Sequence, residues 1–194
     1  MCSGTRTLTW LAAKCGQILP SRGYPKGCAF CAPLTSNVKR ALNMKHRIAA
    51  GVIVENSDRI LLVRHTKPGL YDFWVAPGGG AEGTEDLFAA AKREVFEESG
   101  LHVEPLQIAY IEEFSNPNTR ECKIWFTGRL LGGTISTEAS EAKREHVTEA
   151  AWLSRSDFAG KTVFPPMLHT EYWKDRANGF AFSRYVGVRA MQFY

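Results

Sequence analysis

From residue 44 onward, short apolar runs alternate with breaks rich in glycine, proline and asparagine, whereas residues 1–43 keep no sustained period. Apolar or alternating runs bounded by turn residues predict strands, and an apolar run with helical spacing predicts a helix. The predicted strands are Ile48–Val54, Ile60–Arg64, Phe73–Val75, Val103–Phe114, Lys123–Leu131 and Ala150–Leu153. The predicted helices are Glu85–Ser99, closed by Gly100 in the left-handed position that helix ends favour, and Pro165–Asp175.

A run of three glycines, Gly78, Gly79 and Gly80, follows Pro77 and precedes the longer predicted helix. No helix or central strand accommodates such a run, so it predicts a loop. Glycines let the backbone approach a ligand closely and turn amides or carbonyls toward it. The run lacks the Gly-Lys-Ser/Thr of the phosphate-binding P-loop and the Gly-x-Gly-x-x-Gly of dinucleotide-binding folds.

Three glutamates crowd the second half of the predicted helix. Glu94, Glu97 and Glu98 stand at positions i, i+3 and i+4 and share one face. Their repulsion costs roughly 0.2–0.5 kcal/mol per pair, and the negative end of the helix dipole adds to that cost. Clustered carboxylate oxygens are the ligands that Mg²⁺ and Mn²⁺ prefer, and a bound cation would offset both costs. The alternative is a solvated acidic face, and the adjacent glycine run favours a metal-assisted diphosphate site over it.

The spacing of these residues resembles the signature of the Nudix hydrolase family. Gly79, Glu85 and the run Arg93-Glu94-Val95-Phe96-Glu97-Glu98-Ser99-Gly100-Leu101 match the Nudix box at its seven fixed and two aliphatic positions. The box covers 23 residues, and a weaker resemblance of the flanking strands extends from about Met44 to the C-terminus. The resemblance implies an α/β (α+β) fold, an α/β/α sandwich with a mixed central sheet and the box helix on one face.

The resemblance also carries residue roles onto the matching positions. It implies that four residues hold the divalent metal: Glu94, Glu97, Glu98 and Gly78, the last through its carbonyl. It implies that three residues are structural within the box: Glu85, Arg93 and Gly100. The implied reaction is hydrolysis of a nucleoside diphosphate linked to another moiety, with Mg²⁺ or Mn²⁺ neutralising the diphosphate and activating water. Glu97 and Glu98 are the expected catalytic glutamates of the box.

The general base is left open. In the family it is a box glutamate or a glutamate on a later loop, and the candidates outside the box are Glu112, Glu113, Glu138, Glu141, Glu145 and Glu149. Glu145 is favoured because residues 138–149 stand where that loop is expected, and a solvated surface acid is the alternative for each candidate. A diphosphate needs cations and a nucleobase needs an aromatic platform, so Arg47, Arg64 and Trp74 are predicted substrate contacts. Surface positions are the alternative for the two arginines and a core position is the alternative for Trp74. The glycine run adds Gly79 as a fourth contact.

The resemblance limits the substrate to a small nucleotide without naming it. A proline about sixteen residues after the box is associated with ADP-ribose hydrolases of the family, and Pro117 stands there, in a turn that favours proline anyway. ADP-ribose or a nucleotide sugar is therefore the first hypothesis. A sanitising hydrolase of modified nucleoside triphosphates and a non-catalytic nucleotide-binding module on the same fold are the alternatives.

Charge divides the chain into two parts. Of the 194 residues, the first 54 hold eight Lys or Arg and no acid, so all 20 Asp and Glu lie beyond them. We interpret residues 1–43 as a basic, flexible N-terminal extension and residues 44–194 as the hydrolase domain. Translation from Met44 and a targeting segment are the alternatives for the extension. The net charge of +4 arises in that extension, which weakens the hypothesis of a nucleic-acid partner.

Composition sets the expected surroundings of the protein. No apolar run reaches the roughly 18–20 residues that span a bilayer, so no membrane partner is expected. Five cysteines without a paired pattern suit a reducing compartment, and we expect a cytoplasmic protein, with organelle import through residues 1–43 left open. Cys28 and Cys31 lack the further ligands of a zinc site, and Cys122 is expected to be buried in a strand. The aromatic stretch from Phe164 to Tyr194 packs over the sheet, closes the cleft or forms a homodimer surface.

Overall fold

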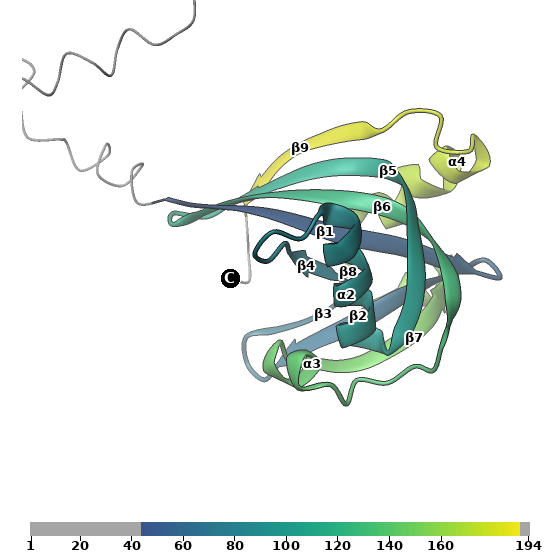
Figure 1. Ribbon diagram of the computed structural model, residues 1–194. Coiled ribbons are helices and arrows are strands. Elements are labelled where there is room, and N and C mark those ends of the chain that lie inside the picture. Colours follow the sequence, from purple (N-terminus) through teal and green to yellow (C-terminus); the bar gives the residue numbers. More distant parts are fainter. Residues whose placement is uncertain (1–43, 191–194) are drawn as a thin grey trace, which may run out of the picture. The chain divides into compact units, whose positions relative to one another are not determined.

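The computed structural model describes residues 44–190 of the chain. Nine strands form one curled, mixed sheet in the order β8-β3-β2-β1-β6-β5-β9, with β4 paired to β1 and β7 paired to β2 (Figure 1). The strands are β1 Lys45–Asn56, β2 Arg59–Lys67, β3 Tyr71–Val75, β4 Gly78–Gly80, β5 Leu101–Ser115, β6 Thr119–Gly133, β7 Val147–Ser154, β8 Val163–Phe164 and β9 Arg184–Ala190. The helices are α2 Leu87–Ser99, α3 Ser140–Arg144 and α4 Glu171–Ala177, with 3₁₀ turns η2 Arg155–Phe158 and η3 Pro166–His169.

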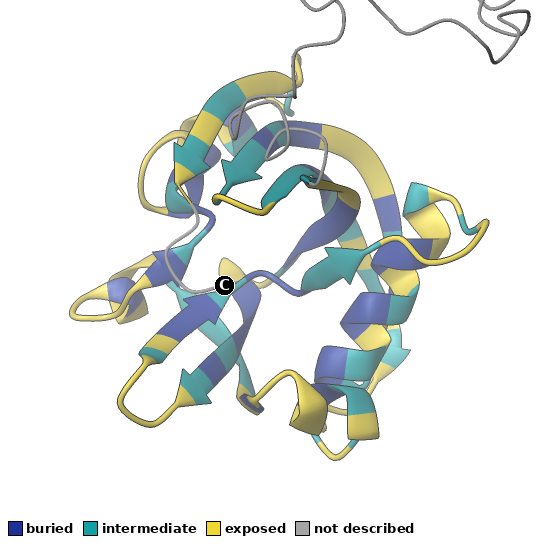
Figure 2. Cartoon of the chain, turned by 90° about the vertical axis from the view of Figure 1, so that its left-hand side faces the viewer, coloured by how far each residue is buried: buried dark blue, intermediate teal, exposed yellow. Residues whose placement is uncertain are grey.

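Strand β1 joins two parts of the sheet. It pairs in parallel with β6 from Lys45 to Val54, and its last two residues pair antiparallel with β2. The run Ala49–Val54 is buried at every position, because both faces of this strand are covered. Exposed positions concentrate in the loops between the strands (Figure 2). The predicted strand Ile48–Val54 is confirmed.

Helix α2 covers one face of the sheet, in front of it in Figure 1. Ala90, Ala91 and Val95 pack into a core with residues of β1, β5 and β6. The Asp86 carboxylate accepts from the Ala89 N–H (2.8 Å) and caps the helix, so α2 begins at Leu87 rather than at residue 85 as predicted. Gly100 ends it in the left-handed conformation, with φ of 72°, as predicted.

The glycine run forms a strand, where a loop was predicted. Gly78, Gly79 and Gly80 pair antiparallel with Gly51, Ala50 and Ala49 of β1. A Cβ on Gly78 would collide with the backbone of Gly51, and the φ of Gly78 is 149°. The two backbones therefore approach so closely that only glycine fits, and β4 is a short side branch of the sheet rather than a central strand.

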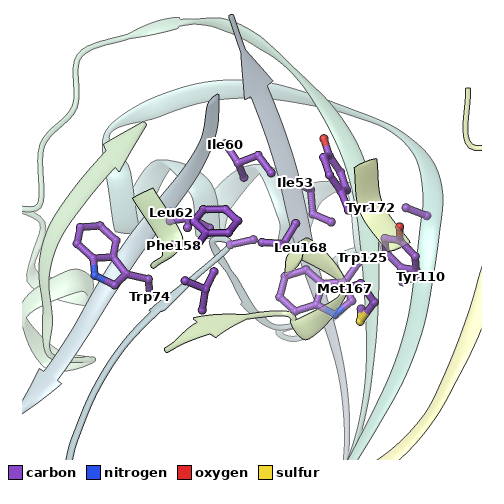
Figure 3. Close-up of a cluster of buried hydrophobic side chains, with 13 residues drawn as sticks. Ile53, Ile60, Leu62, Trp74, Tyr110, Trp125, Phe158, Met167, Leu168 and Tyr172 are labelled. Carbon is purple, nitrogen blue, oxygen red and sulfur yellow. The ribbon is translucent and has the colours of Figure 1, made fainter. Parts of the chain in front are cut away.

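The opposite face of the sheet carries a second core. Side chains from β1, β2, β3, β5 and β6 meet Phe158, Met167, Leu168 and Tyr172 from η2, η3 and α4, and Figure 3 shows them pointing toward one another. The predicted helix Pro165–Asp175 is in fact a 3₁₀ turn followed by α4, with Thr170 between them. Helical elements thus lie on both faces, which confirms the expected sandwich with a mixed sheet.

Other predictions meet the structure in different ways. Strands β5 and β6 extend the predicted ranges at both ends. Cys122 lies in β6 as predicted but is only half-buried. Within residues 44–190, no helix combines the length and the apolar character needed to cross a membrane. Residues 1–43, with Cys28 and Cys31, lie outside the described part of the chain.

Candidate functional site

Two glutamates of α2 meet a third that follows α3. Carboxylate oxygens of Glu94, Glu98 and Glu145 all lie within 4.8 Å of one another. Glu94 and Glu98 are buried, with 6% and 3% exposure, whereas Glu145 lies at the surface. Residue 145 is held where α3 ends, because its N–H donates to the carbonyl of Glu141 (3.0 Å). We call these three side chains the carboxylate cluster.

Negative charge is costly in the carboxylate cluster. Burial raises the pKa of Glu94 to about 7, the charge of Glu98 adds to the rise, and Arg93 opposes it. Burial and the charge of Glu98 also raise the pKa of Glu145, against the opposing influence of His65 and Lys123. Near neutral pH the cluster therefore retains part of a proton, which a bound cation would displace.

Arg93 connects β4, the segment before α2 and the carboxylates of the helix. Its guanidinium donates to Glu85 (Nη2–Oε1 2.6 Å) and to the carbonyl of Gly80 (3.0 Å). Its Nη1 also lies 3.0 Å from oxygens of both Glu94 and Glu97. The hydrogen bond from Arg93, together with one from the Glu82 N–H, holds the pKa of Glu85 below its usual range. The geometry is that of a brace, the role that the box resemblance implies for Arg93 and Glu85.

Strand β4 touches the carboxylate cluster through its backbone. The Gly78 N–H donates to Glu98 (2.8 Å), and a Cβ at residue 79 would lie 2.5 Å from the carboxylate of Glu94. Close approach of that carboxylate therefore requires glycine at position 79. The carbonyl of Gly78 accepts from the Lys123 ammonium (2.6 Å), so a cationic side chain occupies the oxygen expected to complete the metal site.

The expected metal ligands fall into two groups. The structure brings Glu94 and Glu98 together, because they are one helical turn apart. Glu97 is rotated by about 100° from Glu98 around the helix, and its carboxylate lies on Arg93 instead. Within the described residues, the carboxylate oxygens that the fold brings together are those of Glu94, Glu98 and Glu145. The Glu97 carboxylate and the Gly78 carbonyl are instead paired with Arg93 and Lys123.

Among the six glutamates considered as general base, only Glu145 joins the cluster. The others make contacts elsewhere: Glu112 with Trp125 and Arg189, Glu113 with Arg120 and Tyr185, Glu138 with Lys143, Glu141 with Ser140, and Glu149 with Arg64. The position of Glu145 follows from the short helix α3, which contacts α2 and whose Ala142 packs in a small core with Val63 of β2 and Val147 of β7.

Of the predicted substrate contacts, Arg47 and Gly79 lie beside the cluster. A Cβ on Gly80 would collide with Nη2 of Arg47, so the guanidinium lies against β4. The Arg47 side chain is half-exposed and lies 3.5 Å from Glu121, and its charge lowers the pKa of Glu145. The Arg47 guanidinium is therefore within reach of a phosphate bound next to the carboxylate cluster.

The structure does not bring Arg64 and Trp74 to the carboxylate cluster. They are cross-strand partners on β2 and β3, next to the pair His65 and Phe73. Because successive side chains of a strand point to opposite faces, and His65 faces Glu98, Arg64 and Trp74 face away from it. Trp74 is buried in the second core, and both residues line a separate cavity of about 380 Å³ on that side. Arg64 is paired there with Asp72 (2.7 Å).

Two residues of the site were not predicted. His65 is buried, its Nδ1 donates to the carbonyl of Glu145 (3.0 Å), and its Nε2 lies 3.5 Å from Glu98. Its ring stacks on Phe73 at 5.2 Å. Lys123 is the second, and a lysine within an otherwise apolar stretch of strand was the available signal for it. His65 gave no comparable signal, since it stands at the end of its strand among polar residues.

The donor set fits a hard divalent cation. Two buried carboxylates and a third at the surface offer oxygen ligands. The raised pKa values of Glu94 and Glu145 indicate that the protein alone leaves the charge of these two groups partly uncompensated. Mg²⁺ and Mn²⁺ prefer such oxygens and keep further positions for water and phosphate. Glu94, Glu98 and Glu145 are therefore the residues that would hold the cation.

Two curated proteins are similar to this chain in sequence. The human protein named 8-oxo-dGDP phosphatase NUDT18 is 33% identical over 122 residues, which are 63% of this chain and 36% of that protein. The Danio rerio protein of the same name is 31% identical over 108 residues, or 56% of this chain and 32% of that protein. The chain thus spans about a third of the length of the curated relatives it matches.

Solved structures share the fold at low sequence identity. A Nudix hydrolase from Nitrosomonas europaea has a TM-score of 0.58 and 23% identity, covering 73% of this chain and 93% of that one. A Streptococcus suis protein named an ADP-ribose pyrophosphatase has a TM-score of 0.53 and 20% identity, covering 74% and 98%. The family model described as NUDIX domain matches residues 45–173, which include the box, the glycine strand and all three clustered carboxylates. The chain belongs to the Nudix family.

Proposed function

We propose that the protein is a metal-dependent hydrolase that cleaves the diphosphate linkage of a nucleoside diphosphate derivative. The observation that carries the proposal is the carboxylate cluster, in which Glu94, Glu98 and Glu145 lie within 4.8 Å beside a glycine strand. A non-catalytic binding module would not need acids from two distant segments held together at a cost in charge. The intact box and its Arg93 brace support catalysis rather than simple binding.

The side chains divide the work of an in-line displacement at phosphorus. Glu145 offers one carboxylate oxygen to the cluster, and its second oxygen accepts the proton of the attacking water, while the new P–O bond forms and the bridging P–O bond breaks. The Gly78 N–H orients Glu98, and Arg93 fixes the helix against β4. Arg47, whose guanidinium lies against β4 beside the carboxylate cluster, contacts phosphate oxygens. The divalent cation, when bound, neutralises phosphate charge and activates the water.

Two substrate classes follow from two observations. The relatives named 8-oxo-dGDP phosphatase favour an oxidised purine nucleoside diphosphate, a variant of the sanitising hypothesis. Pro117, exposed in the turn between β5 and β6, keeps ADP-ribose or a nucleotide sugar as the second class. We place the oxidised nucleotide first, because the match to those relatives extends over more of the chain than one proline does.

Hydrolysis of a nucleotide panel tests the proposal. The panel holds 8-oxo-dGDP, 8-oxo-dGTP, ADP-ribose and a nucleotide sugar, each with Mg²⁺ or Mn²⁺ and with EDTA. We expect turnover of one class that EDTA abolishes and that Glu98→Gln and Glu145→Gln each lower at least about 100-fold. Glu138→Gln is the matched control, since that exposed carboxylate lies before α3 and pairs with Lys143. Tight binding of a panel member without turnover would favour the binding module.

A further inference from the structure

A buried lysine and a buried glutamate stand opposite each other on the sheet beside β4. Lys123 of β6 and Glu112 of β5 are cross-strand partners, with 8% and 1% exposure. Side chains directly opposite in an antiparallel pair are about 4.5–5.5 Å apart at Cβ, close enough for these two to form an ion pair. Each nevertheless makes its described contacts with other groups. The question is therefore why buried Lys123 and Glu112, with opposite charges, do not pair with each other.

The charge of Glu112 is neutralised from the C-terminal strand. Arg189 of β9 donates from Nε to Glu112 (2.6 Å), and the Trp125 indole N–H donates to the other carboxylate oxygen (3.0 Å). The guanidinium lies over the rings of Phe114 and Phe164, at 5.0 and 5.3 Å. Strand β9 lies beyond residues 45–173, the part of the chain that the family model matches. A segment outside the family core therefore takes up the carboxylate next to Lys123.

Lys123 is directed toward the carboxylate cluster instead. Its ammonium donates to the carbonyl of Gly78 (2.6 Å) and lies over the Trp125 ring at 4.5 Å. The N–H of the same Gly78 donates to Glu98, so the ammonium is one residue of backbone away from the cluster. Its charge also acts on Glu145. An ammonium has three donors, and the Gly78 carbonyl takes one of them.

We propose that Lys123 is a substrate-binding residue whose ammonium contacts diphosphate oxygens, and that Arg189 keeps it free for this contact by neutralising Glu112. The inference rests on the proposed function, since it places the diphosphate beside the carboxylate cluster. Arg189, Lys123 and Glu112 together carry one net positive charge. Because Arg189 pairs with Glu112, that remaining charge lies on Lys123, beside Gly78. A phosphate is the ligand whose charge and acceptor oxygens suit that ammonium.

Removal of Arg189 has a definite consequence under this proposal. Glu112 would keep a buried charge without its cation, which is strongly unfavourable. Lys123 is the cation directly across the strand pair, so it would turn from Gly78 to Glu112. Arg189 thus acts on the substrate through Lys123 and is a positioning residue, whereas Lys123 itself touches the substrate.

The first test measures binding of inorganic pyrophosphate with Mg²⁺ by isothermal titration calorimetry on the full chain. Lys123→Met removes the charge and keeps the length of the side chain, and we expect a dissociation constant at least about tenfold higher. Lys161→Met is the matched control, because Lys161 lines the separate cavity on the opposite side, and its value should stay within about twofold. Thermal unfolding of each variant shows whether it is folded.

The second test uses rescue, which a merely structural role would not produce. Arg189→Met should weaken pyrophosphate binding about as much as Lys123→Met does, and adding Glu112→Gln should restore it, because no buried charge is then left to capture Lys123. This pair also decides the matter if Lys123→Met does not fold. Unchanged binding in Arg189→Met, or no rescue in the double variant, overturns the proposal. If the unaltered protein hydrolyses nucleotides and Lys123→Met binds pyrophosphate as well as it does, the inference fails and the proposed function stands. Absence of both hydrolysis and pyrophosphate binding in the unaltered protein overturns both.

Discussion

Glu94 offers the sharpest test of the carboxylate cluster, because its burial makes a signed prediction about stability. Burial raises the pKa of Glu94 from the ordinary 4.5 to about 7. Between these values the folded protein binds more protons than the unfolded chain, so the stability of the metal-free protein falls as pH rises. The loss is complete above the folded pKa. At about 1.4 kcal/mol per pH unit, it amounts to about 3 kcal/mol at pH 8.

The substitution Glu94→Gln removes this cost, since an amide carries no charge to bury. In EDTA, we expect the variant to be more stable than the unaltered protein by about 3 kcal/mol at pH 8 and by about 1 kcal/mol at pH 5. Urea unfolding followed by circular dichroism measures both differences. Glu82→Gln is the matched control, because Glu82 is an exposed acid between β4 and α2, and it should change stability by less than about 0.5 kcal/mol at either pH.

Added Mg²⁺ links this cost to the proposed cation. A cation that binds only the folded state raises its stability, so the unaltered protein should gain stability with Mg²⁺ at pH 8 and Glu94→Gln should gain less. The reasoning would be refuted by a Glu94→Gln variant that is less stable than the unaltered protein at pH 8 in EDTA. That result would mean that Arg93 already compensates the buried charge in full.

Three further predictions concern the surroundings of the cluster. Gly79→Ala places a Cβ against the Glu94 carboxylate, so kcat should fall at least about 100-fold, a loss that single-turnover hydrolysis would show in the chemical step. Arg93→Gln removes the brace and should cost roughly 2–4 kcal/mol in urea unfolding, with a smaller cost contradicting its bracing role. Tyr110→Phe deletes the hydrogen bond to buried Asp175 (3.0 Å) and should cost about 1–2 kcal/mol while kcat stays unchanged; a lower kcat would show coupling across the sheet.

The features that the sequence predicted well are those controlled by local spacing. The box helix ends at Gly100 because a left-handed cap depends on a single residue. The carboxylates of Glu94 and Glu98 lie close together because the two residues are one helical turn apart. The start of the helix was misplaced by two residues, because Asp86 rather than the preceding residues provides the cap. Helix periodicity alone cannot distinguish these starting points.

The sequence did not predict the features that depend on which face of the sheet a side chain points to, or on which strands pair. Arg64 and His65 are neighbours in the chain, yet only His65 reaches Glu98, since side chains alternate between faces and a shift of one residue exchanges them. The glycine run was predicted as a loop because its pairing with β1 depends on a backbone approach to Gly51. Lys123 and its partner Gly78 are 45 residues apart in sequence, and no local pattern joins them.

The arrangement of charge around β4 explains how one small site can bind both a cation and a diphosphate. The fold compensates its acids unevenly, since Glu97 lies on Arg93 and Glu98 accepts from Gly78, while the pKa values of Glu94 and Glu145 stay raised. Uncompensated negative charge is therefore concentrated where a cation would lie. The positive side chains Arg47 and Lys123 lie against the same glycine strand. Acids alone would repel a diphosphate, and cations alone would displace the metal, so the narrow backbone of β4 keeps the two kinds of charge separate and within reach of one ligand.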